Sequence, residues 1–126
     1  MLNLKRLKNS FKYALQGLSR AAREGQNFRV MIIVGAVVIV LMLALNVDRL
    51  EKAILTLAIA LVLVLELMNS IFERVVDLLK PRMHLQVKEI KDIMAGGVLV
   101  ASVGAALVGL IVLGPYLMAW LATISQ

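Results

Sequence analysis

Three apolar runs, at residues 28–47, 53–72 and 94–113, constrain the fold more than any other feature of this chain. A helix needs about 20 such residues to cross the roughly 30 Å hydrocarbon core of a bilayer. Hydrophobic residues make up 61% of the sequence, whereas they make up roughly half of a soluble domain. The sequence therefore predicts a single all-α membrane domain, 1–126, with three transmembrane helices.

The segment 1–27 is predicted to form an amphipathic helix on the membrane surface. Apolar side chains recur every three or four residues at Leu4, Leu7, Phe11, Leu15 and Leu18, while basic side chains occupy the other faces. This spacing is typical of a helix that lies in the interface with one face in lipid. A disordered basic leader is the alternative, but the length of the stripe favours the helix.

Basic residues gather before the first run and between the second and third. The net charge of +6 could suit nucleic acid, but Arg49 and Lys52 of the first loop are offset by acids, and no basic residue follows Asp92. By the positive-inside rule, the N-terminus and the second loop are cytoplasmic and the C-terminus lies outside. We expect lipid rather than nucleic acid as the partner.

Glu66 lies about two-thirds of the way along the second apolar run. A charge near the bilayer centre costs roughly 2.5 to 3.5 kcal/mol even on lenient scales, so such acids tend to serve a function. At about 100° per residue, Asn69, Glu73 and Asp77 fall on the same side of the helix as Glu66. This polar stripe is a candidate site.

Lys91 and Asp92 at the start of the third run complete a polar cluster at the predicted cytoplasmic edge. Carboxylates suit Mg²⁺, which is often held by one or two of them together with substrate phosphates. A lysine can neutralise a phosphate during transfer, and Glu66 could accept a proton from a lipid hydroxyl. The cluster therefore favours phosphoryl transfer to a lipid alcohol.

The same residues also allow other functions. Glu66 alone could be a neutral acid bonded to a neighbouring helix, and Asn69 could serve as interhelical glue. Lys91 and Asp92 could simply anchor the third helix. A three-span channel whose pore is lined by Glu66 is an alternative that leaves Asn69 and Lys91-Asp92 without a role.

Two prolines and a row of small residues mark features of the helices. Pro81 is expected to end the second helix, and Gly114-Pro115 to break the third near the outer surface. Tyr116 and Trp120 would be interfacial anchors. Small residues at Gly97, Ala101, Ala105 and Gly109 recur every four positions and predict a packing seam within or between subunits.

The segment from Glu66 to Asp77, ELMNSIFERVVD, resembles the Glu-x-x-Asn-Ser-Ala-Ile-Glu-x-x-Val-Asp signature of prokaryotic diacylglycerol kinases and related undecaprenol kinases. KDIMAGGV, which begins at Lys91, is similar to the family's Lys-Asp-Met-Ala-Ala-Gly-Ala-Val. The resemblance covers nearly the whole chain. It implies a homotrimeric kinase of the bacterial cytoplasmic membrane that uses ATP and Mg²⁺, with sites shared between subunits.

The resemblance also implies a role for each matching residue. Glu66 would be the general base, with Asn69, Lys91 and Asp92 as further catalytic residues. The nucleotide would bind at Glu73, Asp77, Lys91 and His84, although His84 viewed alone is more simply a surface residue. Glu73, Asp77 and Glu24 would bind the metal. Glu24 departs from the pattern by one residue, because Gly25 occupies the family's glutamate position, and Ile71-Phe72 replaces the usual Ala-Ile.

The acceptor has two candidates. Diacylglycerol is the default for the family, and it would be converted to phosphatidic acid. Undecaprenol is the runner-up, because Ala95-Gly96-Gly97 looks more like the Gram-positive branch of the family.

Overall fold

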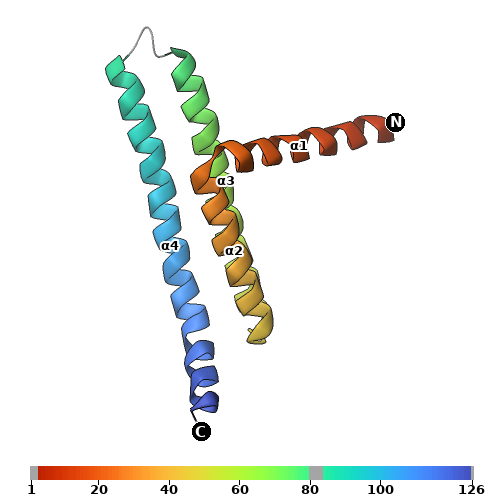
Figure 1. Cartoon of the computed structure of the whole chain (residues 1–126), viewed down its shortest axis with the longest axis vertical. Helices are drawn as coiled ribbons and strands as arrows, with labels where there is room; N and C mark the ends of the chain where they lie inside the picture. The colour runs from red at the N-terminus through yellow and green to blue at the C-terminus, as the bar shows by residue number, and fades with distance from the viewer. Residues whose placement is uncertain (1–2, 80–83, 126) are drawn as a thin grey trace.

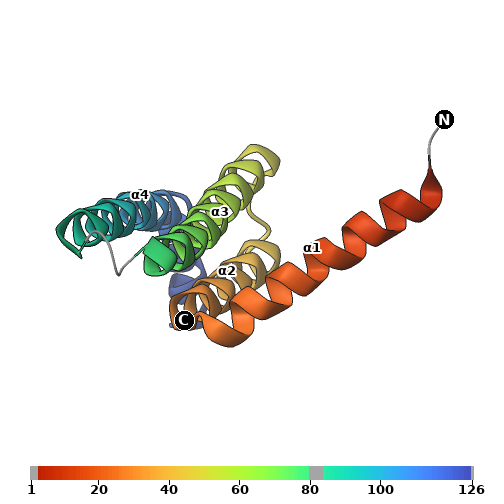
Figure 2. The ribbon, with the colours of Figure 1, turned by 90° about the horizontal axis from the view of Figure 1, so that it is seen from above.

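The computed structural model describes residues 3–79 and 84–125, and every element in those ranges is a helix. The helices are α1 (Leu4–Glu24), α2 (Gln26–Ala44), α3 (Arg49–Leu79) and α4 (His84–Ile124). Figure 1 shows α2, α3 and α4 running lengthwise beside one another, while α1 leaves the group sideways. From above, α1 extends well beyond the other three helices (Figure 2).

The three lengthwise helices match the three predicted spans. Gln26–Ala44, Arg49–Leu78 and Leu85–Ile124 are each long and apolar enough to cross a membrane. Many of their large apolar side chains are exposed, as lipid-facing residues of a membrane helix should be. The helices also extend beyond the apolar runs, most of all α4, which begins ten residues before residue 94.

The expected break at Gly114-Pro115 is wrong, because α4 continues through both residues to Ile124. Proline removes one backbone N–H and crowds the preceding turn. A non-helical segment in an apolar environment would leave several backbone groups without partners, which costs more than one missing hydrogen bond. The predicted end of α3 at Pro81 lies outside the described residues, and α3 itself ends at Leu79.

Gly25 separates α1 from α2 and sets the direction of α1. Its backbone is extended, with φ −93° and ψ 111°, so it ends one helix and begins the next. A Cβ at this position would lie 2.9 Å from the carbonyl oxygen of Ala21, closer than side chains tolerate. The sharp turn at the α1–α2 junction therefore depends on glycine.

The α2–α3 turn packs against the far part of α4. Met42, Val47, Leu55, Val112 and Leu113 form a buried cluster there. Next to it, the Tyr116 hydroxyl donates a hydrogen bond to Oε2 of Glu51 (2.7 Å) and accepts one from the backbone N–H of Asp48 (3.2 Å). These contacts tie α4 to the start of α3.

An apolar cavity of about 450 Å³ lies between α2, α3 and α4. Its lining includes Gly35, Ile59, Val62, Ser102, Ala105 and Gly109. A Cβ at Gly97 or Gly109 would meet nothing within 4 Å. Within the chain, the row of small residues on α4 therefore does not bring another helix into close contact at these glycines.

Replacing Tyr116 with phenylalanine should destabilise the fold by about 1 kcal/mol, because both hydrogen bonds of the hydroxyl are lost while the ring remains. Unfolding in detergent micelles, followed by circular dichroism, measures the change. Tyr13→Phe is the matched control, since Tyr13 is exposed on α1 and its hydroxyl has no hydrogen bond within the described part of the chain. Equal stability of the two variants would contradict the role given to Tyr116.

Candidate functional site

Glu66 and Asn69 are the polar or charged side chains that the described residues bury, with exposed fractions of 4% and 7%. Both lie on α3, and α3 packs chiefly on α4. Burying an ionised carboxylate without a partner is costly, and no hydrogen bond or ion pair to Glu66 is present within residues 3–79 and 84–125. The structure thus places the predicted base in the interior of the bundle.

Asn69 connects the buried part of the stripe to its exposed part. Its amide nitrogen donates to Oε1 of Glu73, one turn further along α3, at 3.3 Å. This bond assigns the orientation of the amide. The carbonyl oxygen of Asn69 is then buried and has no hydrogen-bond partner among the described residues. Buried acceptors are normally satisfied, so this oxygen is available to a donor from a ligand, a water or another subunit.

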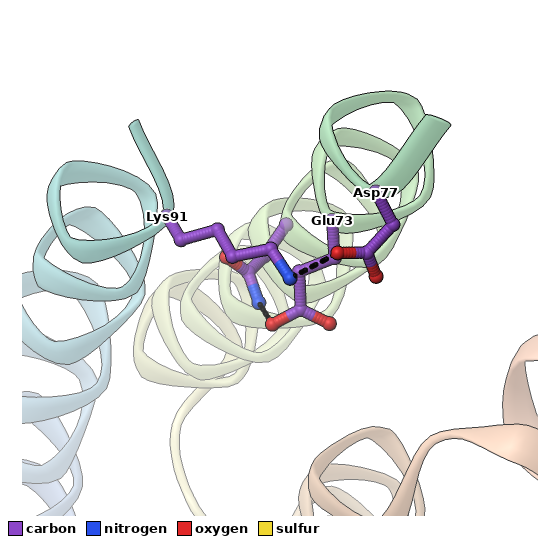
Figure 3. A network of polar contacts seen from close by, with 4 residues as sticks. Glu73, Asp77 and Lys91 are labelled. Carbon is purple, nitrogen blue, oxygen red and sulfur yellow. Dashed lines mark hydrogen bonds and ion pairs between the residues drawn. The ribbon is translucent and has the colours of Figure 1, made fainter. Parts of the chain in front are cut away.

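Lys91 reaches across from α4 to the stripe on α3. Its Nζ lies 2.6 Å from Oδ1 of Asp77. Figure 3 shows the Lys91 side chain extending from α4 toward Asp77, with Glu73 nearby on α3. The two side chains are 30% and 50% exposed, so solvent screens the pair and its contribution to stability is modest. Two predicted site residues that are 14 positions apart are therefore in contact.

Glu24 makes a contact that the sequence did not indicate. Its Oε2 lies 2.7 Å from Nη2 of Arg74, the residue after Glu73. The pair joins the end of α1 to α3, and both side chains are at least half exposed. Arg74 is one of the basic residues between the second and third apolar runs, and no local pattern links two residues that are 50 positions apart.

Two predicted site residues are not joined to this network. The Asp92 side chain is exposed on α4 and has no hydrogen bond or ion pair in the described part of the chain. His84 begins α4, but its side chain lies outside the described residues. No group of three or more His, Asp or Glu side chains within the described ranges could hold a metal ion by itself. Metal binding at Glu73, Asp77 and Glu24 stays a prediction.

The arrangement combines three chemical capabilities within about three turns of α3. Glu66 offers a carboxylate shielded from water, Asn69 an amide oxygen without a partner among the described residues, and Lys91 of α4 a cation in contact with the exposed Asp77. A shielded carboxylate can remove a proton from an alcohol, and a lysine can neutralise the charge of a phosphate. The exposed end of the stripe is open to water, whereas its buried end faces the apolar bundle.

The family model described as prokaryotic diacylglycerol kinase matches residues 12–113. A diacylglycerol kinase from Synechocystis is 39% identical over 101 residues, which cover 79% of this chain and 58% of that protein. An undecaprenol kinase from Bacillus subtilis is 32% identical over 114 residues, covering 90% of this chain and 93% of that protein. A diacylglycerol kinase from Pseudomonas aeruginosa is 34% identical over 98 residues, with 78% and 80% covered. The family description and these names indicate a lipid kinase.

The contact between Lys91 and Asp77 predicts energetic coupling of these side chains. In a cycle of Asp77→Asn, Lys91→Met and the double variant, the two losses of stability should be non-additive by about 0.5 to 1 kcal/mol, the range of partly exposed pairs. Unfolding in detergent micelles measures the loss of stability for each single variant and for the double variant. A control cycle that combines Lys91→Met with Glu89→Gln, in place of Asp77→Asn, should show no coupling, because Glu89 is an exposed acid of α4. A Lys91–Asp77 coupling of zero would contradict the observed geometry.

Proposed function

Because the chain belongs to the prokaryotic diacylglycerol kinase family, we propose that it transfers the γ-phosphate of ATP to the hydroxyl group of a membrane lipid alcohol. The observation that carries this proposal is the stripe on α3, which leads from the buried carboxylate of Glu66 to the partly exposed ion pair between Asp77 and Lys91 of α4. A lipid hydroxyl and a water-soluble triphosphate must meet, and such a stripe gives each an environment that suits it.

Glu66 is the general base of the proposed reaction. Its burial favours proton transfer from an alcohol that arrives through the apolar part of the bundle. The lipid oxygen then attacks the γ-phosphorus, the bond to the β-phosphate oxygen breaks, and ADP leaves. The carbonyl oxygen of Asn69, three residues along the helix, has no partner among the described residues and can accept a hydrogen bond from a donor other than this hydroxyl, whose single proton goes to Glu66.

Lys91 and Asp92 act at the exposed end of the stripe, where the γ-phosphate of ATP is proposed to lie. Lys91 already points toward α3, because Asp77 holds its ammonium group, and a γ-phosphate beside Asp77 would lie within its reach. A fixed cation at this place stabilises the charge of the transferred group. Asp92 is exposed next to Lys91 and is assigned to the same end, together with His84 on the nucleotide side.

Glu73 and Asp77 are the residues that would hold Mg²⁺ with the nucleotide phosphates. They lie one turn apart on one face, are exposed, and offer oxygen ligands, which fits an ion that needs one or two carboxylates plus phosphates. Glu24 contacts Arg74, the residue after Glu73, and is kept as a third proposed ligand. When bound, the ion neutralises phosphate charge.

Diacylglycerol is the proposed acceptor, and undecaprenol is the alternative. Relatives with both names match the chain, so the names alone do not choose between them. The apolar cavity supports an acceptor with a long tail, because Val62 in its lining is one helical turn from Glu66. A tail in the cavity would place its head group at the buried end of the stripe.

We further propose that the protein lies in the bacterial cytoplasmic membrane with its N-terminus and the α3–α4 connection inside, as the distribution of basic residues predicts. In this orientation α1 is an amphipathic helix on the inner surface. A homotrimer is proposed as well, because three thin helices leave much of the polar stripe uncovered.

The test of the function is a kinase assay with both acceptors. The purified protein in mixed micelles receives labelled ATP, Mg²⁺ and either diacylglycerol or undecaprenol. ATP-dependent formation of phosphatidic acid supports the main proposal, and undecaprenyl phosphate supports the alternative. Absence of any lipid phosphate would exclude both and leave the channel function.

Glu66→Gln should remove nearly all turnover, by about 100-fold or more, because the amide cannot accept the proton. ATP affinity, measured by titration with a fluorescent nucleotide, should change little, since Glu66 is two turns away from the exposed acids. Glu89→Gln is the control and should keep normal activity. Full turnover of Glu66→Gln would show that another group is the base.

Glu73→Gln should raise the Mg²⁺ concentration needed for half-maximal activity by at least about tenfold, because one carboxylate ligand is replaced by a neutral amide. Initial rates over a series of Mg²⁺ concentrations at fixed ATP measure the effect. An unchanged Mg²⁺ dependence would exclude Glu73 as a ligand.

A further inference from the structure

Helix α1 has two chemically distinct sides. At 100° per residue, Leu4, Leu7, Phe11, Leu15 and Leu18 lie within an arc of roughly 80°, and their exposed fractions range from 43% to 76%. The remaining surface carries Lys5, Arg6, Lys8, Lys12, Arg20 and Arg23, and the helix has no acidic residue before Glu24. In the described residues these apolar side chains are not covered by the rest of the chain.

The direction of α1 suits a membrane surface. It leaves the lengthwise helices sideways at Gly25, next to the start of the first span (Figures 1 and 2). When α2, α3 and α4 cross the bilayer, α1 therefore lies near the plane of the lipid headgroups. A helix in this position inserts its apolar side and presents its cations to the phosphates around it.

We propose that α1 is a binding surface for anionic lipids, and that the Glu24–Arg74 ion pair couples the docking of α1 to the position of the kinase-site residues on α3. The occupant is the negatively charged leaflet itself. Six cations with no acid among them complement such a surface, whereas a neutral leaflet would need only the apolar side.

The connection to the site is direct. Glu24 is the last residue of α1, and its carboxylate contacts Arg74, the neighbour of Glu73. Docking of α1 fixes the position of Glu24 and thereby that of the α3 segment that carries Glu73 and Asp77. An exposed ion pair transmits only a small energy, so the expected activation is roughly two- to fivefold. This inference rests on the proposed kinase function.

Docking can be measured without any activity. The chain has no cysteine, so a single cysteine at Ala14, on the edge of the apolar arc, can carry an environment-sensitive fluorophore in the full-length protein. The protein is reconstituted in phosphatidylcholine bilayers with or without about 30 mol % phosphatidylglycerol. We expect a blue-shifted probe only with the anionic lipid, and no shift for a probe at Gln16 on the polar side.

The charge requirement is tested by the triple variant Lys5→Gln, Lys8→Gln and Lys12→Gln. In this variant the fluorophore at Ala14 should show no blue shift when phosphatidylglycerol is present, as in phosphatidylcholine alone. A probe equally buried in both bilayers, or a triple variant that still responds, would show that α1 binds through its apolar side alone and would overturn the proposal.

Coupling is tested by the kinase rate in the same two bilayers. The natural chain should be two- to fivefold faster with phosphatidylglycerol. Arg74→Gln should keep the probe response but lose this acceleration, whereas Arg49→Gln, an exposed arginine at the other end of α3, should retain it. An Arg74→Gln protein that still accelerates would refute the coupling. If the probe responds but neither bilayer supports lipid phosphorylation, the kinase function fails and the lipid-binding surface stands.

Discussion

The burial of a carboxylate within an apolar helix is the constraint on which the rest of this structure depends. Glu66 and Asn69 cannot face acyl chains without a large cost, so α3 must present them to another helix. Packing of α3 on α4 provides that cover and also determines which α4 residues approach the stripe. Lys91 meets Asp77 as a result of the same packing. The arrangement that protects the acid from lipid thus also places a cation two to three turns away from it.

Much of the fold could be predicted, because hydrophobic length and helical periodicity are local properties. The three spans and the shared face of Glu66, Asn69, Glu73 and Asp77 follow from the spacing of residues within one helix. The predicted break at Pro115 was wrong, because apolar surroundings penalise every unpaired backbone group and so favour a continuous helix despite the one hydrogen bond that proline removes. The Glu24–Arg74 contact depends on how α1 turns at Gly25, a tertiary feature without a sequence signature.

The site is distributed over three helices with different surroundings. α3 carries the acids, α4 supplies the lysine, and the end of α1 is tied to α3 through Arg74. The ion pairs are partly exposed, so each contributes little stability by itself. Such weak contacts suit the proposed kinase site, in which these side chains would exchange their internal partners for nucleotide phosphates during each cycle. The strongly buried group, Glu66, would need no such exchange.

Helix α4 is long enough to carry contacts at both ends of the molecule, so that a movement at one end changes the position of residues at the other. Its 41 residues extend for about 60 Å, roughly twice the thickness of the hydrocarbon core. Tyr116 fastens one part of this rod to the α2–α3 turn, and Lys91 lies 25 residues away, at a distance of about 38 Å. A rotation of the rod by about 3° around Tyr116 displaces Lys91 by about 2 Å, which is comparable to the 2.6 Å that separates it from Asp77. Helices tilt to match bilayer thickness, so the distance between Lys91 and Asp77 depends partly on the thickness of the surrounding membrane.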